Sequence, residues 1–479
     1  MKTLTGLFEG HLGIEIEEHR VDLNTKTLSR APHPQALGDR RSQPYFQTDF
    51  SESMEELITA PQDSVVGALA NLRSLQAILQ LNLQPQEIIW GLSMPPRLQE
   101  SDVVFLKNTF HRDWYLKYRN WLLKHYGPFH HIICGVHVNY SPLDATIADF
   151  QQQHHLTSTV TAKNRLLFLI AQQIVGYRWL VTYFFGAAPV SENPADDLPK
   201  QLRSLAPVRS FRSSSYGFAN RANVRASYAN LTKFIADLQQ LIATKQLAGM
   251  SEFYGPVRLK GAELADLQTK GIEYLEFRIL DDDPFVATGV SAKSLYFLQF
   301  LVADALSQQH EWTVSELAAA EQKNEEVALQ HPQQPLTTDQ FQQTIRLLQR
   351  FEKLISSAPV KLQPDLISTL QWLQSALDHP HQTVSGRLLK KIEHGSLTAF
   401  ALHQGQGYRK QFQTSPASTN FPQVPANLRQ SYIKLHQVGL PMKLIEGGWL
   451  EVQLPSGKKD GVTFGCRFKS SRLLVRNYD

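Results

Sequence analysis

The chain has 479 residues, more than one hydrophobic core usually holds, so a large catalytic unit with appended pieces or two to three domains is expected. With 42% hydrophobic and 19% charged residues it is an ordinary globular protein, and its net charge of +4 does not indicate nucleic acid or a membrane surface as a partner. Residues 1–20 lack the apolar stretch of a signal peptide and no segment could span a bilayer, so we expect a cytoplasmic protein.

The first predicted element is a strand at residues 13–17 that gives one face to acids. Its two-residue period sends Leu12, Ile14 and Ile16 to one side and Glu15 and Glu17 to the other. The sequence pattern leaves open whether this acidic face is a cation site or an exposed strand surface.

The next segment, residues 49–59, predicts a helix. Asp49 and Glu52 have the three-residue spacing of a capping box. On such a helix Asp49 and Glu56 would lie two turns apart on one face. A helix N-cap for Asp49 and a solvated helix face for Glu56 are the alternatives to a role as ligands.

Two later strands also carry polar side chains on one face. Residues 135–139 place His137 and Asn139 together, and residues 274–279 place Glu276 and Arg278 opposite an apolar face. A hydrogen-bonded core histidine and a same-face ion pair are the structural alternatives. Helical patterns surround these strands at about 64–82, 101–126, 162–184, 225–246, 292–308, 338–356, 364–378 and 384–402.

Strands that alternate apolar and polar residues favour an α+β fold with a largely antiparallel sheet and one open face. Weaker strand patterns occur around Val257 and within 441–468, where 449–454 and 462–468 predict a hairpin. The Ser/Thr- and Pro-containing residues 411–426 predict a linker. We therefore divide the chain into a catalytic domain at 1–410, this linker, and a small β-containing tail at 427–479.

The acids suit a metal site, because Mg²⁺ takes hard oxygen ligands and shares them with substrate phosphates. Basic residues could bind the phosphates, since arginine forks hold anions bidentately. These are Arg209, Arg212, Arg221 and Arg225 around residues 213–217, and Arg258 and Lys260 near Tyr254. A polar surface loop is the alternative for residues 209–225. The chain contains no Walker A, HExxH or GxSxG motif and no GxGxxG after a strand, so no motif supports a P-loop, dinucleotide or hydrolase function.

Taken in order, these segments resemble the bacterial glutamate–cysteine ligase family, also called γ-glutamylcysteine synthetase. The resemblance is collinear over about residues 7–310. It is carried by residues 13–17 with Arg20 and Val21, 48–50 and 56–59, 90–95, 118–119, 135–141, 183–189 and 271–278.

The resemblance implies a glutamine-synthetase-like fold, in which a curved, mainly antiparallel sheet forms an active-site funnel packed by helices. It also implies an ATP- and Mg²⁺-dependent ligase (Mn²⁺ being the alternative metal) that catalyses the first step of glutathione biosynthesis. The γ-carboxylate of L-glutamate is phosphorylated, and the amine of L-cysteine then displaces phosphate to give γ-glutamylcysteine and ADP.

Position by position, the resemblance implies metal ligands at Glu15, Glu17, Asp49, Glu56, His137 and Glu276. The implied catalytic residues are Glu276, Arg278 and Arg212, and ATP would be bound by Tyr254, Arg258 and Arg278. Arg119 and Arg212 match arginines for substrate carboxylates or the phosphorylated intermediate, while Phe50, Tyr118, Leu122 and Phe218 match the pocket for the cysteine side chain. The chain departs from the family pattern at Phe218, where tyrosine is common, and at Ala188, where serine is common.

Two other functions remain open on sequence grounds. One is a γ-glutamyl ligase of the same fold with a different amine acceptor, and the other is a non-catalytic nucleotide-binding relative. Some relatives continue into an ATP-grasp domain that adds glycine, and we expect this chain to be too short for that second reaction.

Overall fold

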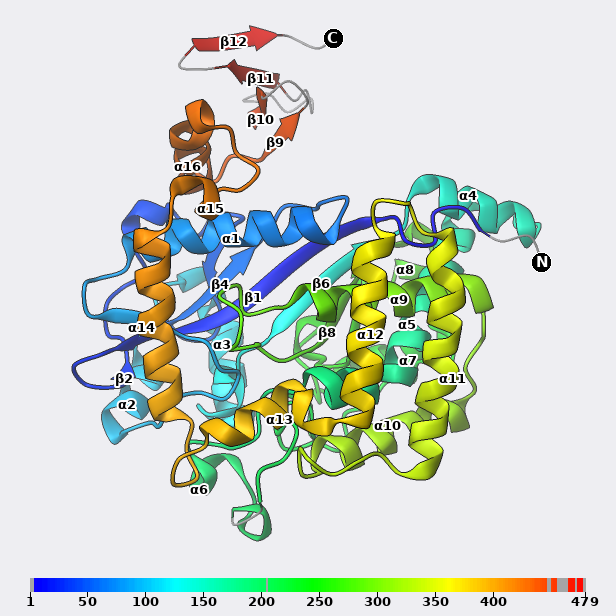
Figure 1. The fold of residues 1–479 in the computed structure, drawn as a ribbon, viewed down its shortest axis with the longest axis horizontal. Helices are drawn as coiled ribbons and strands as arrows, with labels where there is room; N and C mark the ends of the chain where they lie inside the picture. Colours follow the sequence, from blue (N-terminus) through cyan, green and yellow to red (C-terminus); the bar gives the residue numbers. More distant parts are fainter. Residues whose placement is uncertain (1–3, 204–205, 446–448, 455–463, 470–471, 477–479) are drawn as a thin grey trace.

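The computed structural model describes residues 4–203, 206–445, 449–454, 464–469 and 472–476. One eight-stranded antiparallel sheet forms its centre, in the order β3-β4-β1-β6-β8-β7, with β2 and β5 pairing with other lengths of β1 (Figure 1). The strands are β1 (His11–Asp22), β2 (Thr27–Leu28), β3 (Phe46–Thr48), β4 (Met54–Ile58), β5 (Glu87–Trp90), β6 (Val136–Ser141), β7 (Val257–Gly261) and β8 (Ile272–Leu280).

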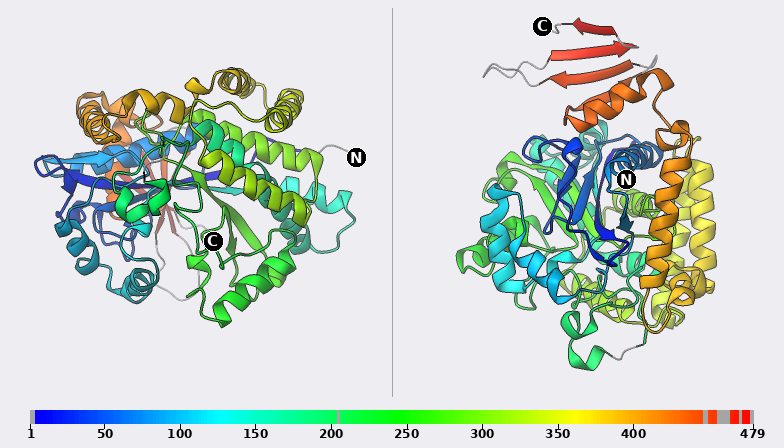
Figure 2. Two further views of the ribbon diagram at one scale, coloured as in Figure 1. Left: turned by 90° about the horizontal axis from the view of Figure 1, so that it is seen from below. Right: turned by 90° about the vertical axis from the view of Figure 1, so that its left-hand side faces the viewer.

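Helices pack on one face of this sheet, which we call the back face. α1 (Val65–Asn82) contacts β1, α5 (Thr159–Phe185) contacts β8, and α9 (Ala292–Gln308) packs on both helices (Figure 2). The remaining helices are α2 (Glu100–Asn108), α3 (Leu116–Tyr126), α4 (Asp144–Gln153), α6 (Pro194–Asp197), α7 (Leu231–Ala243), α8 (Leu267–Lys270), α10 (Val314–Ala328), α11 (Thr338–Leu354), α12 (Gln363–Asp378), α13 (Val384–Leu388), α14 (Thr398–Thr414), α15 (Ala417–Asn420) and α16 (Arg429–Gln437).

The alternation along β1 divides the sheet as predicted. Ile14 and Ile16 are fully buried in the core on the back face, whereas Glu15 and Glu17 belong to the opposite face, which we call the front face. The predicted α+β class with a mainly antiparallel sheet is confirmed, and the sheet is open rather than a closed barrel.

Several helices begin where a side chain can accept a hydrogen bond from a backbone N–H group of the first turn. Ser64, Ser158 and Ser291 cap α1, α5 and α9 in this way. The predicted helices at 64–82, 162–184, 292–308, 338–356 and 364–378 are confirmed, and the pattern at 225–246 corresponds to the shorter α7. Helix α10, which we did not predict, starts at a capping box formed by Thr313 and Glu316.

The predicted helix at 49–59 is wrong, because this segment is the turn and second strand of the β3–β4 hairpin. The Asp49 N–H donates to the Met54 carbonyl at 3.1 Å, which closes the turn. Glu52 makes no capping box and instead pairs with Arg40 at 3.2 Å. Acid spacing alone therefore misled the sequence interpretation, while Ser51 and Ser53, which hydrogen-bond each other inside the turn, were the better signal.

Two long predicted helices are interrupted. The pattern at 101–126 is divided into α2 and α3: the backbone becomes extended at Thr109 (φ −110°, ψ 113°), and the ring of Phe110 after it lies 4.6 Å from the Arg119 guanidinium. The pattern at 384–402 breaks between α13 and α14 where His394 and Gly395 adopt positive φ angles of 52° and 77°.

The C-terminal region adds a second antiparallel sheet, in the order β12-β11-β10-β9. Its strands are β9 (Met442–Ile445), β10 (Trp449–Leu454), β11 (Phe464–Lys469) and β12 (Arg472–Arg476), and they project from the main body beyond α16 (Figures 1 and 2). The β10–β11 pairing confirms the predicted hairpin, whose loop lies outside the described residues.

The segment predicted as a linker, 411–426, contains the end of α14 and all of α15. Phe412, Phe421 and Val424 from this segment are buried in the main core. The segment is therefore packed against the catalytic unit, and the division of the chain into domains stays a prediction.

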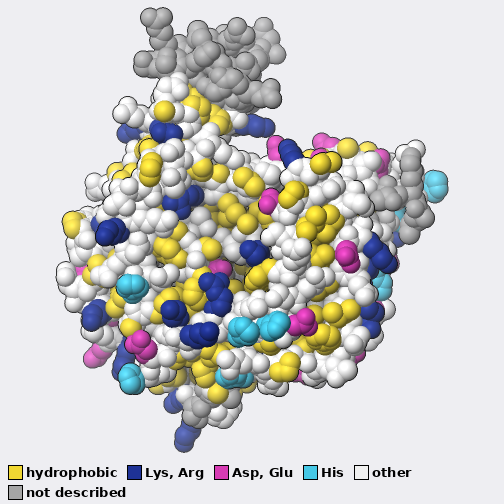
Figure 3. All heavy atoms as spheres, in the orientation of Figure 1, with side chains coloured by type: hydrophobic (Ala, Val, Ile, Leu, Met, Phe, Trp, Pro, Cys, Tyr) yellow, Lys and Arg dark blue, Asp and Glu magenta, His cyan; other side chains and the backbone are white. Residues whose placement is uncertain are grey.

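The surface on the side shown in Figure 3 mixes basic, acidic, histidine and apolar side chains, with a group of Lys and Arg near its middle. Two cation–ring contacts occur in and just after α13: the Arg387 guanidinium lies 3.7 Å from the Phe285 ring centroid, and Lys391 Nζ lies 5.9 Å from that of Phe400. Among the described residues, no helix is both long enough and apolar enough to cross a membrane.

Candidate active site

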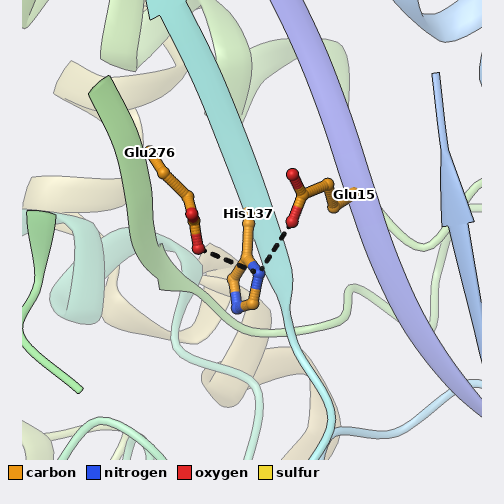
Figure 4. A group of neighbouring side chains, drawn as sticks. All are labelled: Glu15, His137 and Glu276. Carbon is orange, nitrogen blue, oxygen red and sulfur yellow. Dashed lines mark hydrogen bonds and ion pairs between the residues drawn. The ribbon is translucent and has the colours of Figure 1, made fainter. Parts of the chain in front are cut away.

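Strand register brings the predicted acids and histidine together on the front face. Glu15 of β1 lies opposite His137 of β6, and Asn139 of β6 lies opposite Glu276 of β8. On the other side of β1, Glu17 lies opposite Glu56 of β4. Three strands thus direct Glu15, His137 and Glu276 toward one point (Figure 4).

The distances in this cluster suit a shared cation. His137 Nδ1 lies 3.4 Å from Glu15 Oε2 and 3.7 Å from Glu276 Oε1, and its Nε2 lies 3.9 Å from Glu17 Oε1. One ligand atom from each of Glu15, His137 and Glu276 falls within 4.8 Å of the others. Asn139 donates to Glu15 Oε1 at 2.8 Å and so fixes the orientation of that carboxylate.

Glu276 is completely buried among three cations. Arg278 hydrogen-bonds its carboxylate, Lys260 lies 2.8 Å from Oε2, and Arg258 lies 3.5 Å from Oε1. Burial alone would raise the pKa of Glu276, but these cations, Arg278 above all, hold it well below its usual value. The carboxylate is therefore ionised and available as a metal ligand.

The other front-face acids repel one another. Burial is the main cause that raises the pKa of Glu17 and Glu56 well above its usual range, and the charge of Asp49 raises both further. Asp49 itself has a raised pKa because it is buried. A cation bound among these groups would remove the repulsion, which is what a carboxylate metal site provides.

His137 is held neutral at this point. Burial and the nearby Arg278 charge lower its pKa to about 4. In the described part of the chain its Nε2 has no hydrogen-bond partner. The carboxylate oxygens around it are the hard donors that Mg²⁺ or Mn²⁺ prefers, and the neutral imidazole offers a nitrogen donor beside them.

Arg212 follows Ser210, whose backbone pairs with that of Ala188, and it is only 3% exposed. Its Nε donates to the Cys134 carbonyl at 2.7 Å, and its Nη1 lies 3.5 Å from Asp281 Oδ1. Gly135 leaves the space for it, because a Cβ at Gly135 would lie 1.9 Å from Arg212 Nη2.

Arg119 does not join this cluster, and its contact with a substrate carboxylate stays a prediction. It is 1% exposed, its Nε donates to the Phe50 carbonyl at 2.8 Å, and its Nη2 donates to the Leu106 carbonyl. The guanidinium also lies 4.8 Å from the Phe50 ring. The structure thus gives Arg119 a supporting role: it holds Phe50 in place.

The residues predicted for the cysteine pocket form one aromatic region. Phe50 and Leu122 share a small buried cluster against which Tyr118 packs. Phe218 connects through Tyr254, whose ring lies 4.7 Å away, and its own ring lies 5.3 Å from the Arg278 guanidinium. Of the two other residues predicted for the ATP site, Tyr254 therefore borders the aromatic region and Arg258 borders Glu276.

The sequence interpretation missed other residues of this region. His131 is buried between the aromatic side chains, 5.2 Å from Phe50 and 5.4 Å from Tyr254. Asp281 contacts both Arg212 and Ser213, at 3.5 Å and 3.4 Å, and so fixes the end of the loop. Three successive aspartates after β8, at 281–283, were the sequence signal that could have indicated the contacts of Asp281 with Arg212 and Ser213.

The site thus places ionised and protonatable carboxylates next to guanidinium groups that still have free donors. Arg278 Nε, Arg258 Nε and Arg112 Nε are buried and lack hydrogen-bond partners among the described residues. Carboxylates that hold a divalent cation beside arginines that can hold phosphate oxygens are the parts that phosphoryl transfer requires.

Comparison with known proteins gives a consistent result. A family model for glutamate-cysteine ligase matches residues 2–327. The glutathione biosynthesis bifunctional protein GshAB of Streptococcus agalactiae is 32% identical over 415 residues, which cover 84% of this chain and 52% of that protein. The chain therefore spans about half the length of the curated relatives it matches.

Solved structures agree on the fold. A bifunctional glutathione synthetase from Pasteurella multocida superposes with a TM-score of 0.84 at 28% identity, over 96% of this chain and 60% of that one. A Francisella tularensis glutamate–cysteine ligase, solved in complex with AMP, gives a TM-score of 0.77 at 23% identity, over 91% and 93% of the two chains.

Proposed function

Because the chain belongs to the glutamate–cysteine ligase family, we propose that it joins the γ-carboxylate of L-glutamate to the amine of L-cysteine at the expense of ATP. The products are γ-glutamylcysteine, ADP and phosphate, and the reaction takes place in the cytoplasm. L-Glutamate, L-cysteine and ATP are the small-molecule partners.

One observation supports this function most strongly: Glu15, His137 and Glu276 converge beside Arg278 on the front face. A carboxylate oxygen is a poor leaving group until it is phosphorylated. Phosphoryl transfer is accelerated mainly by positioning and by neutralising the charge of the triphosphate, so acids that hold Mg²⁺ and arginines that hold phosphate are both needed.

We assign the metal to Glu15, Glu17, Asp49, Glu56, His137 and Glu276. When bound there, Mg²⁺ or Mn²⁺ would neutralise phosphate charge and polarise the phosphorus–oxygen bond that breaks when the phosphoryl group is transferred. Glu276 supplies an ionised oxygen because its cationic neighbours keep it deprotonated. His137 supplies a neutral nitrogen because burial lowers its pKa to about 4.

The arginines act on the transferred group. Arg278 Nη1 lies at hydrogen-bond distance from Glu276 and 3.3 Å from His137, so the guanidinium lies beside the metal ligands, and its Nε has no partner among the described residues. With Arg258 and Tyr254 it lines the ATP-phosphate region. Arg212, held by Cys134 and Asp281, binds the glutamate carboxylate or the acyl phosphate through its remaining donors.

The acceptor pocket is formed by Phe50, Tyr118, Leu122 and Phe218. A thiol is weakly polar and is tolerated among these side chains, whereas a serine hydroxyl loses its water contacts there. A pocket of this kind discriminates poorly between acceptors that differ by one methyl or methylene, which is worth only about 1–3 kcal/mol. Phe218, which gives no hydroxyl, is the observation that favours a second candidate, a γ-glutamyl ligase with another apolar amine acceptor.

An ADP-release assay with glutamate, Mg²⁺ and ATP across a panel of amines tests the proposal. We expect kcat/KM to fall from cysteine to L-2-aminobutyrate to serine. Serine above 2-aminobutyrate would contradict this description of the pocket. A protein that turns over 2-aminobutyrate but not cysteine would be the second candidate. If no ADP is released with any of the amines, at any concentration, the protein would be a non-catalytic relative.

A further inference from the structure

A small cavity lies behind the sheet, on the opposite side of β1 from the front-face acids. Its volume is about 20 Å³ and its lining comes from β1, α1, the loop after β8, and α14. A space of this size holds one water molecule or one small ion. Glu18, one residue after Glu17, points to this side because successive side chains of a strand alternate.

Two amide oxygens of the lining are left without a donor. Gln76 and Gln80 are four residues apart on α1, so they present side chains on the same face of the helix. They are 3% and 5% exposed, and the Oε1 atom of each is buried with no hydrogen-bond partner from the described residues. Buried polar oxygens that lack a partner require something to satisfy them.

The carboxylate of Glu18 at this cavity also lacks a counter-ion among the described residues, and burial raises its pKa to about 7. Its carboxylate is 4% exposed and accepts one hydrogen bond, from Gln76 Nε2 at 3.3 Å. Asp283, which also lines the cavity, is different, because it accepts the Phe285 N–H at 3.0 Å and the Arg387 charge acts on it. Gly289 also lines the cavity with a φ of +65°; the Cβ it lacks would lie 2.3 Å from Ile16 Cδ1 and 3.6 Å from Glu18 Oε1.

We propose that Glu18, Gln76 and Gln80 bind one monovalent cation, K⁺ or Na⁺, in this cavity. One carboxylate balances one positive charge, and the two amide oxygens complete a set of hard oxygen ligands of the kind that alkali cations take. A divalent ion would need a second uncompensated carboxylate in the lining, and Asp283 does not provide it. Water could satisfy the amide oxygens, whereas a cation also supplies the counter-charge that the buried Glu18 carboxylate lacks when it is ionised.

The bound cation would compensate the buried charge behind the strand that carries Glu15 and Glu17. It would therefore stabilise the folded protein, since a ligand that binds only the folded state raises its stability by mass action. This site is separate from the proposed ligase chemistry, so it can be tested by binding alone.

The test is thermal unfolding of the full chain in tetramethylammonium chloride, titrated with KCl or NaCl at constant total chloride. We expect a saturable rise in Tm of about 3 °C at roughly 100 times the Kd of the preferred cation. Gln80→Leu removes one ligand oxygen at similar volume and should abolish the rise. Gln299→Leu is the matched control, because Gln299 Oε1 is also buried without a partner but lies away from this cavity, and this variant should keep the rise.

Crystals soaked in a thallium(I) salt provide a second readout that needs no variant. Tl⁺ substitutes for K⁺ and scatters anomalously, so we expect an anomalous peak between Glu18 and the two glutamines. A Tm that is the same in all salts, a response only to MgCl₂, an equal response in Gln80→Leu, or a cavity without an anomalous peak would each overturn the proposal.

Discussion

Gly135→Ala should damage catalysis through Arg212, although it adds only one methyl group. The new Cβ would lie 1.9 Å from Nη2, 2.2 Å from Cζ and 2.4 Å from Nε of Arg212. Ordinary contacts are about 3.5–4.0 Å, so the guanidinium must move by more than about 1 Å. That movement breaks the 2.7 Å hydrogen bond from Nε to the Cys134 carbonyl. A hydrogen bond to a charged group is worth about 1.5–3 kcal/mol, which corresponds to a loss of about 10- to 150-fold in kcat/KM.

Steady-state ADP release measures this loss, and a double-mutant cycle assigns it. If Gly135→Ala acts only by displacing Arg212, then Gly135→Ala combined with Arg212→Ala should be no slower than Arg212→Ala alone. Gly407→Ala is the control, because a Cβ there meets no atom within 4 Å. Wild-type kcat/KM in Gly135→Ala, or fully additive losses in the double variant, would refute the reasoning.

Three other outcomes are expected. Glu276→Gln and Glu56→Gln should each lower kcat by at least about 100-fold with an unchanged circular dichroism spectrum, because each removes a ligand charge at nearly constant volume. Glu273→Gln, at an exposed position near the start of β8, should keep full activity. The Mg²⁺ concentration for half-maximal rate should fall as pH rises from about 6 to 8. The pKa values of Glu17 and Glu56 are raised, so protons must leave these carboxylates before a cation binds. A Mg²⁺ concentration for half-maximal rate that does not change with pH would contradict this. Burial lowers the pKa of His436 from 6.5 to about 4, so the unfolded chain binds the extra proton and the free energy of unfolding falls as pH falls through this window. Up to about 3 kcal/mol of that loss should disappear in His436→Phe, as measured by urea unfolding. Equal pH dependence of the unfolding free energy in the wild type and this variant would refute the prediction.

The local sequence pattern was sufficient for the strands that carry the site. Alternation alone placed Glu15, Glu17 and Glu276 on polar faces opposite the core, because the two-residue period is a property of one strand. It could not show that β1, β6 and β8 are neighbours, since pairing register depends on the whole sheet. The resemblance to a family implied that these side chains share one site, and the register of Glu15 with His137 brings two of them together.

Helix signals near charged residues were less informative. Asp49 and Glu56 were predicted to approach each other through two turns of helix, but they approach through a hairpin. The charge of Asp49 still acts on Glu56 in the hairpin, and the role of both acids as metal ligands stays a prediction. Arg119 was assigned from a family motif, and sequence could not reveal that its Nε and Nη2 donate to the main-chain carbonyls of Phe50 and Leu106.

The central claim, that glutamate is activated as an acyl phosphate before cysteine attacks, can be tested by following oxygen. The enzyme is incubated with cysteine, Mg²⁺, ATP and L-glutamate labelled with ¹⁸O in its γ-carboxylate, and the products are analysed by mass spectrometry. The account predicts γ-glutamylcysteine together with phosphate that carries one ¹⁸O atom from glutamate. Absence of the dipeptide, or dipeptide formed with unlabelled phosphate, would contradict it.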